Sequence, residues 1–332
     1  MSITLLFSKK KRKEFTFNRL DEHLKRAREI PFDLKKGKCV IFSDAHKWDR
    51  GKKDYFKANE RLYLKLLDYY LGNKFILVLN GDIEEGQGSK LETVVKKYPD
   101  TFKSENKFKN TGKYYRIYGN HDHSWKDDHV RWKLLYQYFG IFDVSSAYRI
   151  GEKIIILHGH EGDIWSDYLR GLAGIGVRLG KRIFGSRKRA ARNYKIRNIR
   201  ENWLSEWAEK KDILLIAGHT HRPMFKSMSV EENFQVLKNT LSGMRSFEEY
   251  DNTIMVQKKL FPKDKEIEIK VREKERYYNT GGCMFGKEKY RISQITCIEI
   301  ADKKIHLLKW GLENGNLKKE WEKLSNDLSW IL

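Results

Sequence analysis

Five short apolar runs, each followed at once by Asp, His, Asn or Gly, constrain the fold of this chain more than any other feature of its sequence. The runs are KCVIFSDAH (38–46), KFILVLNGD (74–82), YYRIYGNHD (114–122), KIIILHGHEGD (153–163) and DILLIAGHTH (212–221). Apolar runs without alternation are typical of strands that are buried on both faces of a sheet. Helix-like stretches lie between them, such as ANERLYLKLLDYYLG (58–72). Strands that alternate with helices predict a layered α/β fold.

The polar residues that end the five runs are predicted to meet in space. The carboxyl ends of parallel strands lie along one edge of a sheet, and ligands of α/β folds bind at that edge. Glycines at positions 81, 119, 159 and 218 allow the chain to turn sharply there. The residues expected to converge are Asp44, His46, Asp82, Asn120, His121, Asp122, His158, His160, His219 and His221.

Histidines, carboxylates and an amide oxygen in one place indicate a site for divalent metal ions. These groups are ligands of first-row divalent metals, and the lack of cysteine among them argues against a structural zinc site. Two cations about 3.5–4 Å apart can share one bridging hydroxide and hold a phosphoryl group between them. Asp82 is the natural carboxylate to bridge such a pair. We expect two divalent ions, with manganese favoured and iron, zinc, cobalt or nickel compatible with the same ligands.

The order of these motifs, D-x-H, GD, GNHD, HGH and GHTH, resembles the calcineurin-like metallophosphoesterase superfamily. The motifs lie between residues 39 and 226, and YYNTGG with the last strand-like runs extends the similarity to about residue 310. The resemblance implies a layered α/β fold, a β-sandwich of two mixed sheets flanked by helices. It also implies a phosphoric ester hydrolase, either a phosphatase or a phosphodiesterase, with a dinuclear metal centre.

The resemblance assigns a role to each residue that matches a family motif. The first metal ion would be held by Asp44, His46, Asp82 and His221, and the second by Asp82, Asn120, His158 and His219. His121 stands where the family places the group that protonates the leaving oxygen, and Asp122 is expected to shape its loop or to orient it. His160 is expected behind the ligands or at the substrate rim, with an inert surface position equally compatible. Glu84 and Glu85 are expected either to hydrogen-bond a ligand histidine or to be solvated.

Positive charge is the second outstanding property of the chain. Lys and Arg number 67 against 45 acidic residues, which gives a net charge of +22 and favours an anionic partner. Residues 170–200 carry eleven Lys or Arg and no acidic residue, interleaved with apolar residues. This segment is interpreted as a lid over the site that contacts substrate, a membrane surface or nucleic acid, or as a solvated helix pair. Arg187, Arg189 and Arg192, together with His160, are the candidate substrate-binding residues.

The lid position is similar to that of the UDP-2,3-diacylglucosamine hydrolases of the same superfamily. That group usually has Arg where this chain has His121, and this departure puts a lipid-sugar substrate in doubt. We expect residues 1–37 to form a basic N-terminal extension and residues 38–310 the metallophosphoesterase domain. Insertions are expected at about 164–208 and 227–275, and a C-terminal helix at 311–332. Three cysteines in no metal or redox spacing and no long apolar run indicate a cytoplasmic protein without a transmembrane segment, with contact to the inner membrane surface left open.

Three functional hypotheses follow. The leading one is a dinuclear metal-dependent phosphoesterase that cleaves a phosphoester or pyrophosphate bond through a metal-bridging hydroxide, on an anionic, nucleotide-linked or lipid-linked substrate. The second is a metal-dependent nuclease acting on DNA or RNA, for which a steep salt dependence would be diagnostic. The third is a scaffold with the same fold and no catalysis, which the full set of ligand positions disfavours. Oligomeric state and the native metals are not determined by the sequence.

Overall fold

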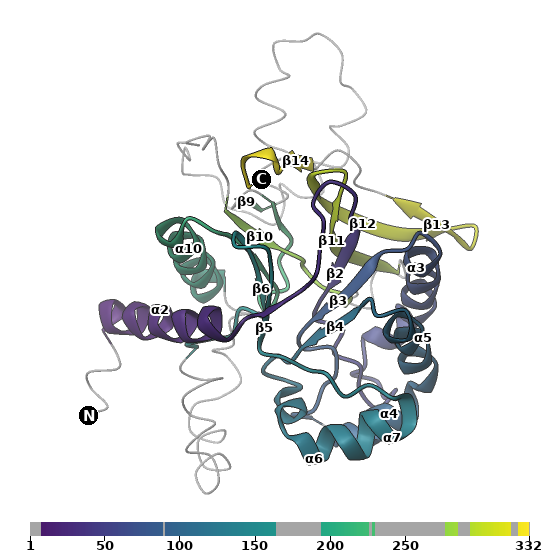
Figure 1. The fold of residues 1–332 in the computed structure, drawn as a ribbon. Helices are drawn as coiled ribbons and strands as arrows, with labels where there is room; N and C mark the ends of the chain where they lie inside the picture. Colours follow the sequence, from purple (N-terminus) through teal and green to yellow (C-terminus); the bar gives the residue numbers. More distant parts are fainter. Residues whose placement is uncertain are drawn as a thin grey trace, which may run out of the picture.

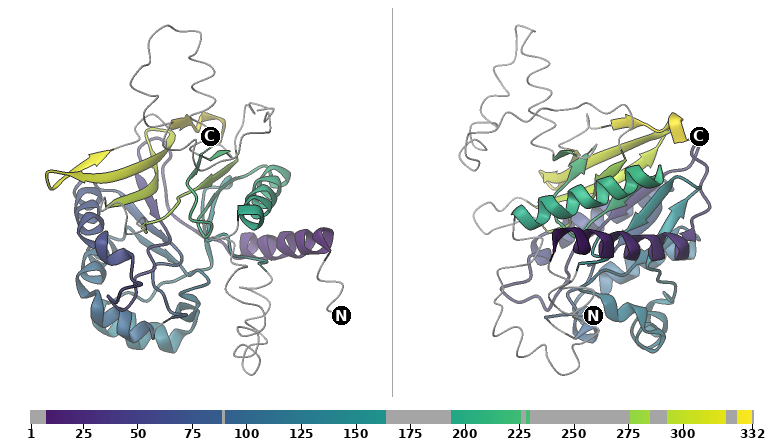
Figure 2. Two further views of the ribbon diagram at one scale, coloured as in Figure 1. Left: turned by 180° about the vertical axis from the view of Figure 1, so that it is seen from behind. Right: turned by 90° about the vertical axis from the view of Figure 1, so that its left-hand side faces the viewer.

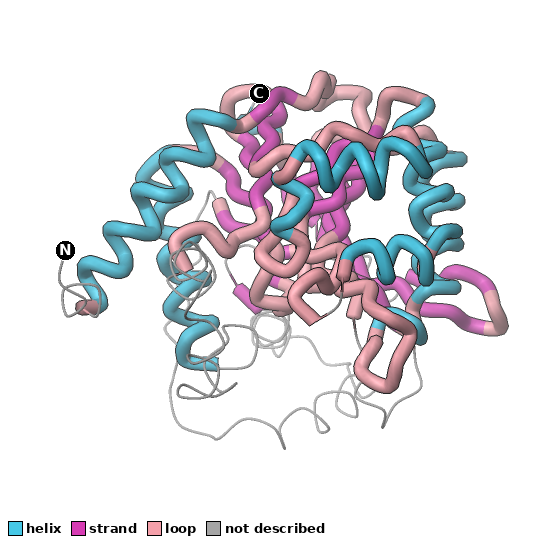
Figure 3. The backbone as a smooth tube through the Cα atoms, turned by 90° about the horizontal axis from the view of Figure 1, so that it is seen from below, coloured by secondary structure: helices cyan, strands magenta, loops and turns pink. Residues whose placement is uncertain are grey.

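Two mixed β-sheets packed face to face form the centre of the molecule (Figure 1). The structure is a computed structural model that describes residues 8–88, 90–163, 194–225, 228–229, 276–284, 293–319 and 325–331. Helices cover the outer face of each sheet, so that the layers run helix, sheet, sheet, helix (Figures 1 and 3). The predicted fold class, a β-sandwich of two mixed sheets flanked by helices, is confirmed.

The first sheet has the strand order β13-β12-β11-β2-β3-β4, and β14 also pairs with β12. Its strands β2, β3 and β4 are parallel, whereas β11 and β12 run antiparallel to their neighbours. The bounds are β2 (Cys39–Phe42), β3 (Ile76–Asn80), β4 (Tyr114–Ile117), β11 (Gln294–Ala301), β12 (Lys304–Glu313), β13 (Asn316–Lys319) and β14 (Ser325–Asp327).

The second sheet has the strand order β1-β5-β6-β7-β10-β8-β9. Strands β6, β7 and β10 are parallel to one another, so their carboxyl ends share an edge. The bounds are β1 (Arg28–Glu29), β5 (Ala147–Ile150), β6 (Ile154–Leu157), β7 (Leu214–Ala217), β8 (Met224–Phe225), β9 (Met228–Ser229) and β10 (Tyr277–Asn279).

The helices divide between the two outer faces. Helices α3 (Glu60–Gly72) and α5 (Pro99–Asn110) pack on the first sheet, and α2 (Lys9–Arg26) and α10 (Tyr194–Lys211) lie side by side over the second (Figure 2). The shorter helical segments are η1 (Phe56–Ala58), α4 (Leu91–Lys97), η2 (His123–Lys126), α6 (Asp128–Arg131), η3 (Trp132–Tyr136), α7 (Gln137–Phe139) and η7 (Ser329–Ile331).

The apolar runs of the sequence are explained by the layers. On β2, Ile41 points into the core between the sheets, whereas Val40 and Phe42 join the core beneath α3 and α5. On β6, Ile154 and Ile156 likewise face the core between the sheets, while Ile155 and Leu157 pack under α2 and α10. Because both faces of these strands are covered, every position is apolar and no alternation appears.

The predicted C-terminal helix at 311–332 is wrong for the described part of that segment. Strand β12 continues to Glu313 and turns through Asn314 and Gly315 into β13, and β14 and η7 follow. Both turn residues have positive φ (51° and 79°), which is the conformation of a two-residue hairpin turn that Asn-Gly favours. The Asn-Gly pair is therefore the local signal that outweighs the helical spacing of the apolar residues behind it.

Residues 1–37 and 164–208 also differ from the expected extension and insertion where the structure describes them. Helix α2 is part of the fold, because Leu20 is buried and Asp21 accepts a hydrogen bond from Trp207 Nε1 of α10 (2.9 Å). Residues 194–208 belong to α10, which buries Leu204 and Trp207 against the second sheet. The rest of the predicted lid, residues 164–193, lies outside the described residues, as does the predicted second insertion except at 228–229. Within the described part of the chain, no helix is long and apolar enough to cross a membrane.

Candidate metal centre

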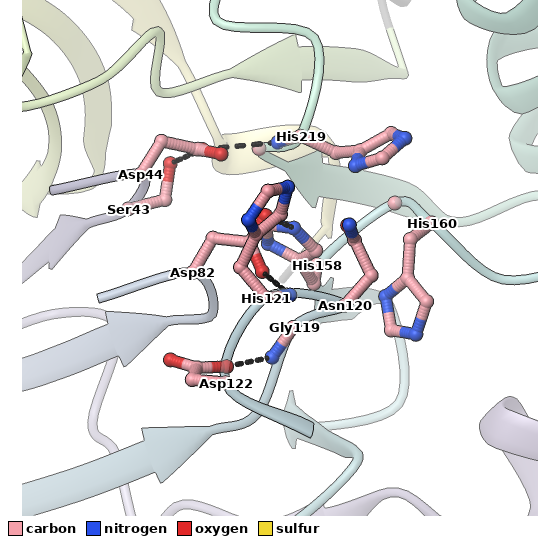
Figure 4. Close-up of polar contacts among 12 residues, drawn as sticks. Ser43, Asp44, Asp82, Gly119, Asn120, His121, Asp122, His158, His160 and His219 are labelled. Atoms are coloured by element: carbon pink, nitrogen blue, oxygen red, sulfur yellow. Dashed lines mark hydrogen bonds and ion pairs between the residues drawn. The ribbon is translucent and has the colours of Figure 1, made fainter. Parts of the chain in front are cut away.

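The loops that follow β2, β3, β4, β6 and β7 meet where the carboxyl ends of the two sheets come together (Figure 4). Asp44 and His46 follow β2, Asp82 follows β3, and the Gly119–Asp122 loop follows β4. His158 and His160 follow β6, and His219 and His221 follow β7. The five loops predicted to converge therefore do so, although they come from two sheets and not from one.

Five of these residues have a left-handed backbone. Asp44, His46, Asp82, His219 and His221 have φ between 46° and 67°. Non-glycine residues rarely adopt this conformation, and where they do so in a group the strain often marks a functional site. The left-handed conformation reverses the direction of the chain directly after the strand, and the side chains of these loops are thereby directed towards the candidate metal centre.

The converging side chains form three overlapping groups of potential metal ligands. In each group, one ligand atom from every member lies within 4.8 Å of the others. The groups share His46 and Asp82, so they form one continuous site and not three separate ones. They are Asp44, His46 and His221; His46, Asp82 and His121; and Asp82, His158 and His219.

The first group brings two imidazoles against one carboxylate. Nε2 of His221 lies 3.0 Å from Oδ1 of Asp44, and Nε2 of His46 lies 3.1 Å from the same nitrogen of His221. Two imidazole nitrogens this close repel unless a proton or a cation lies between them. Nε2 of His46 is also 3.8 Å from Oδ2 of Asp82, which connects this group to the next.

The last group lies on the side of the second sheet. Nε2 of His158 is 3.2 Å from Oδ2 of Asp82, and its other nitrogen, Nδ1, lies 2.8 Å from the backbone carbonyl of Asn80. A proton on Nδ1 is donated to that carbonyl, which leaves Nε2 free to bind a cation. His219 donates its backbone N–H to Oδ2 of Asp44 (3.0 Å), so the two halves of the site are also bonded directly.

Glu85 supports two histidines at once. Its Oε2 lies 2.6 Å from Nδ1 of His121 and 3.4 Å from Nδ1 of His46. Of the two roles left open for this residue by the sequence, the solvated one does not fit, because the carboxylate of Glu85 lies against both rings. Asp163, which sequence reasoning did not single out, lies 3.7 Å from Nε2 of His219. Its only signal in the sequence is its place directly after the HGHEG run.

Asp122 holds the GNHD loop through hydrogen bonds to backbone N–H groups. Its Oδ1 accepts the backbone N–H of Gly119 (2.6 Å), and its Oδ2 accepts that of Ile83 (2.8 Å). The side chain is fully buried, and burial raises its pKa to about 7. Asp122 therefore ties the loop after β4 to the loop after β3 and belongs to none of the three ligand groups.

The protonation equilibria of the site follow from burial and from its carboxylates. Burial alone would lower the pKa of His46 and of His158, but the negative charges of Asp44 and Asp82 outweigh it and raise both values to about 10. Burial lowers the pKa of His121, a shift that Asp82 and Glu85 partly oppose. The same carboxylates that raise these pKa values make the pocket negative and would attract a cation.

The residues fit a divalent metal ion. Nε2 of His219, in a residue that is 7% exposed, has no hydrogen-bond partner among the described residues. A buried polar atom without a partner is rare in native proteins, and a metal ion is one of the few groups that would satisfy it here. The donor set of imidazole nitrogens, carboxylate oxygens and the Asn120 amide is that of a first-row divalent metal. Asn120 lies in the GNHD loop beside His158 and His160 (Figure 4).

The remaining predicted residues are placed as follows. His160 is buried, at 4% exposure, and lies 3.6 Å from Glu161, outside all three ligand groups. This burial does not fit the inert surface position, and whether His160 lies behind the ligands or at the substrate rim stays a prediction. Arg187, Arg189 and Arg192 lie outside the described residues.

The comparison with protein families assigns the chain to a class. The model of the family Calcineurin-like phosphoesterase matches residues 37–241, which is more than half of the chain. The chain belongs to the calcineurin-like phosphoesterase family, as its motifs predicted. This assignment supports a metal-dependent phosphoester hydrolase in general terms. A search of curated proteins found no match.

Solved structures with a similar course of the chain have low sequence identity. A predicted phosphoesterase from Streptococcus pneumoniae is 14% identical, with 85% of this chain and 96% of that chain covered and a TM-score of 0.31. A Vps29 from Entamoeba histolytica, solved with zinc, is 12% identical, with 88% and 99% covered and a TM-score of 0.35. A dimetal phosphatase from Danio rerio is 9% identical, with 85% and 98% covered and a TM-score of 0.37. At these TM-scores the three structures add nothing to the family assignment.

Proposed function

We propose that this chain hydrolyses a phosphoester or pyrophosphate bond with the help of two divalent cations. The observation that carries the proposal is the continuous, buried set of ligand groups that share His46 and Asp82. Asp44, His46, Asp82 and His221 would hold one cation, and Asp82, Asn120, His158 and His219 the other. When bound, the cations would supply Lewis acidity and lower the pKa of a coordinated water to about 7.

The residues around the cations would prepare the substrate and the proton transfer. Glu85 holds Nδ1 of His121, so Nε2 of that ring is left to carry a proton towards the site. His121 would act as the general acid for the leaving oxygen, and Asp82 and Glu85 favour its protonated ring against the burial that lowers its pKa. Asp122 is a positioning residue, because it holds the loop that carries His121 and touches no reacting atom.

The substrate is expected to be anionic. The net charge of +22 attracts phosphorylated molecules, and a pair of cations between two carboxylates would bind phosphoryl oxygens. The finer identity of the substrate, whether nucleotide-linked or lipid-linked, is left to experiment. Manganese is the first metal to test, followed by iron, zinc, cobalt and nickel.

The test is a substrate panel with metal-stripped and metal-loaded protein. The panel contains p-nitrophenyl phosphate, bis-p-nitrophenyl phosphate, nucleotides, a UDP-linked lipid and DNA. We expect hydrolysis that needs added metal, and a His121→Ala variant with turnover lower by about 10²- to 10⁴-fold at near-normal metal content. His129→Ala serves as a matched control, because His129 is exposed and lies outside the ligand groups.

Three outcomes would decide against parts of the proposal. Equal hydrolysis by metal-free protein would exclude the metal mechanism. A folded, metal-loaded protein inactive on the whole panel would favour the scaffold hypothesis. DNA cleavage that falls steeply with salt, without hydrolysis of the small esters, would favour the nuclease.

A further inference from the structure

Four charged side chains without any solvent exposure lie directly behind the candidate metal centre. Lys47 and Arg116 are the cations, and Glu84 and Glu105 are the anions. Nζ of Lys47 lies 3.2 Å from Oε1 of Glu84 and 2.8 Å from Oε1 of Glu105. Arg116 contacts both carboxylates as well, at 3.1 Å from Glu105 and in a short ion pair with Glu84. We call this cluster the buried quartet.

Neutral hydrogen-bond donors complete the buried quartet. Tyr63 donates its hydroxyl to Oε1 of Glu105 (3.2 Å), and Trp125 donates Nε1 to Oε2 of Glu84 (2.8 Å). Lys47 also donates to Oγ1 of Thr101 (3.2 Å), and Tyr114 Oη accepts from Arg116 (3.0 Å). The cluster thus joins α3, α5, β4 and the loops after β2, β3 and β4 with two charges of each sign.

The buried quartet is connected to the candidate ligands through the backbone. Lys47 directly follows His46, and Glu84 follows Asp82 by two positions. Lys47 donates its N–H to the carbonyl of Ile83 (2.8 Å), and Glu85 donates its N–H to the carbonyl of Lys47 (2.8 Å). Any movement of the Lys47 or Glu84 side chain is therefore passed within one or two residues to His46, Asp82 and Glu85.

A contribution to stability alone does not explain these charges. Apolar residues of similar volume in place of a buried ion pair are often neutral or stabilising, because the desolvation of the charges opposes their attraction. Ion pairs differ from apolar contacts in that they fix distance and direction, and here two bidentate carboxylates fix the relative positions of two loops. The function that fits is to hold those loops in one geometry before a cation binds.

The second half of the centre has other supports. His158 is held by the carbonyl of Asn80, and the carbonyl of Gly159 accepts from Nε of Arg200 (2.7 Å). The carbonyl of Gly218, next to His219, accepts from Nδ2 of Asn279 (2.6 Å). Among the described residues, no member of the buried quartet bonds to the loops after β6 or β7. His158 and His219 are therefore held by parts of the fold outside the buried quartet, whereas Asp82 belongs to both candidate cation sites.

We propose that the buried quartet positions the loops that carry His46 and Asp82, and that it therefore affects the candidate cation site containing His46 more than the site containing His219, which shares only Asp82 with it. The proposal rests on the proposed function, since it assigns Lys47, Glu84, Glu105 and Arg116 as positioning residues of the same two-cation centre. None of the four is expected to touch substrate or cation.

The test measures metal binding and not activity. The double variant Lys47→Met with Glu105→Gln removes one charge of each sign and leaves the Arg116–Glu84 pair, so no buried charge is left without a partner. Titration calorimetry with Mn²⁺ on metal-stripped full-length protein gives a dissociation constant for each site. His219→Ala and His46→Ala, each with one site impaired, identify which binding event belongs to which site.

We expect the double variant to weaken the His46 site by about 10- to 100-fold. The His219 site should weaken by less than the His46 site, because Asp82 is the only ligand that the two sites share. Glu299→Gln is the matched control, because Glu299 is a buried carboxylate on β11 that bonds Tyr70 of α3, and it should leave both sites unchanged. Thermal unfolding with chelator present verifies that all variants fold without metal.

Other results of the metal titration would reject the proposal or part of it. A folded double variant with both dissociation constants within twofold of wild type would show that the buried quartet serves the fold alone. Equal weakening of both sites would overturn the predicted difference between them. If the double variant does not unfold cooperatively, Trp125→Phe replaces it, since it removes one hydrogen bond to Glu84 and no charge. That variant should weaken the His46 site by about three- to tenfold, and no change there would reject the proposal. Wild-type protein that binds no metal would instead reject the proposed function.

Discussion

A methyl group added at Gly119 is expected to displace the carboxylate that joins the two candidate cation sites. Gly119 follows β4 and precedes Asn120, with a backbone conformation that alanine also adopts. A Cβ at this position would lie 2.2 Å from Oδ1 of Asp82, 2.6 Å from its backbone nitrogen and 2.8 Å from Cδ2 of His158. All three contacts involve candidate ligands, and one of them is with backbone that cannot rotate away.

The size of the effect follows from these distances. Ordinary contact begins at 3.4 Å, so Oδ1 of Asp82 would have to retreat by about 1.2 Å from its present 2.2 Å. Metal–ligand distances tolerate deviations of only about 0.2 Å, so the displaced carboxylate can no longer serve both sites in the same geometry. Misplacement of a reacting group by about 1 Å costs on the order of 10²-fold in rate. Overpacking of a filled interior adds a loss of about 1–3 kcal/mol in the free energy of unfolding.

The assay combines metal content, turnover and thermal unfolding for Gly119→Ala. We expect substoichiometric metal, turnover lower by about 100-fold or more, and a reduced melting temperature. Gly72→Ala is the matched control, since a Cβ at Gly72 at the end of α3 meets nothing within 4 Å. That control should be neutral or slightly stabilised. Gly119→Ala with full metal content and normal turnover would refute the placement of Asp82 between the two sites.

Three further predictions concern other parts of the centre and the core. Glu85→Gln should lower turnover by about 10- to 100-fold at near-normal metal content, because it weakens the support of His121; steady-state kinetics with metal analysis checks this. Removal of metal by a chelator should destabilise the protein by about 2.7 kcal/mol per occupied site, relative to protein in metal at 100 times the dissociation constant of each site, measured by denaturant unfolding. Glu299 has a pKa that burial raises, so its contribution to stability is present below its unfolded pKa and is lost as the pH rises through the folded value. Glu299→Gln should therefore gain stability relative to wild type as the pH rises above about 4.3, the ordinary pKa of a glutamate, and parallel curves would contradict this.

The strands and the site could be predicted because strands buried on both faces appear in the sequence as continuous apolar runs, and the site residues follow these runs directly. The expected strand of residues 74–82 is found as β3, and that of residues 212–221 contains β7. The sequence did not show that the loops belong to two sheets. That arrangement depends on pairings such as Ile298 with Ile41, which join residues far apart in the chain. A pattern of local residues does not contain such pairings.

The buried quartet could not be predicted for a related reason. Lys47, Glu84 and Arg116 look like ordinary loop and surface residues, because charged residues are almost always solvated. They are buried only because α5 brings Glu105 over the loops after β2 and β3. Each of the four is unfavourable inside the protein by itself, and only the assembled fold supplies its partner. The sequence signal of such a cluster is weak by nature.

The left-handed backbone of five candidate ligands indicates that the fold tolerates backbone strain in order to place their side chains. Glycine would adopt the φ values of Asp44, Asp82 and His219 without strain, whereas other residues lose about 1–2 kcal/mol each in this conformation. The chain does use glycine at Gly81 and Gly159, where φ is 78° and 97° and no side chain is directed into the site. In the loop after β3, Gly81 and the strained candidate ligand Asp82 therefore stand next to each other. A non-glycine residue in this conformation is expected if the fold must bring carboxylates and imidazoles together, and it is not expected if the loops only connect strands.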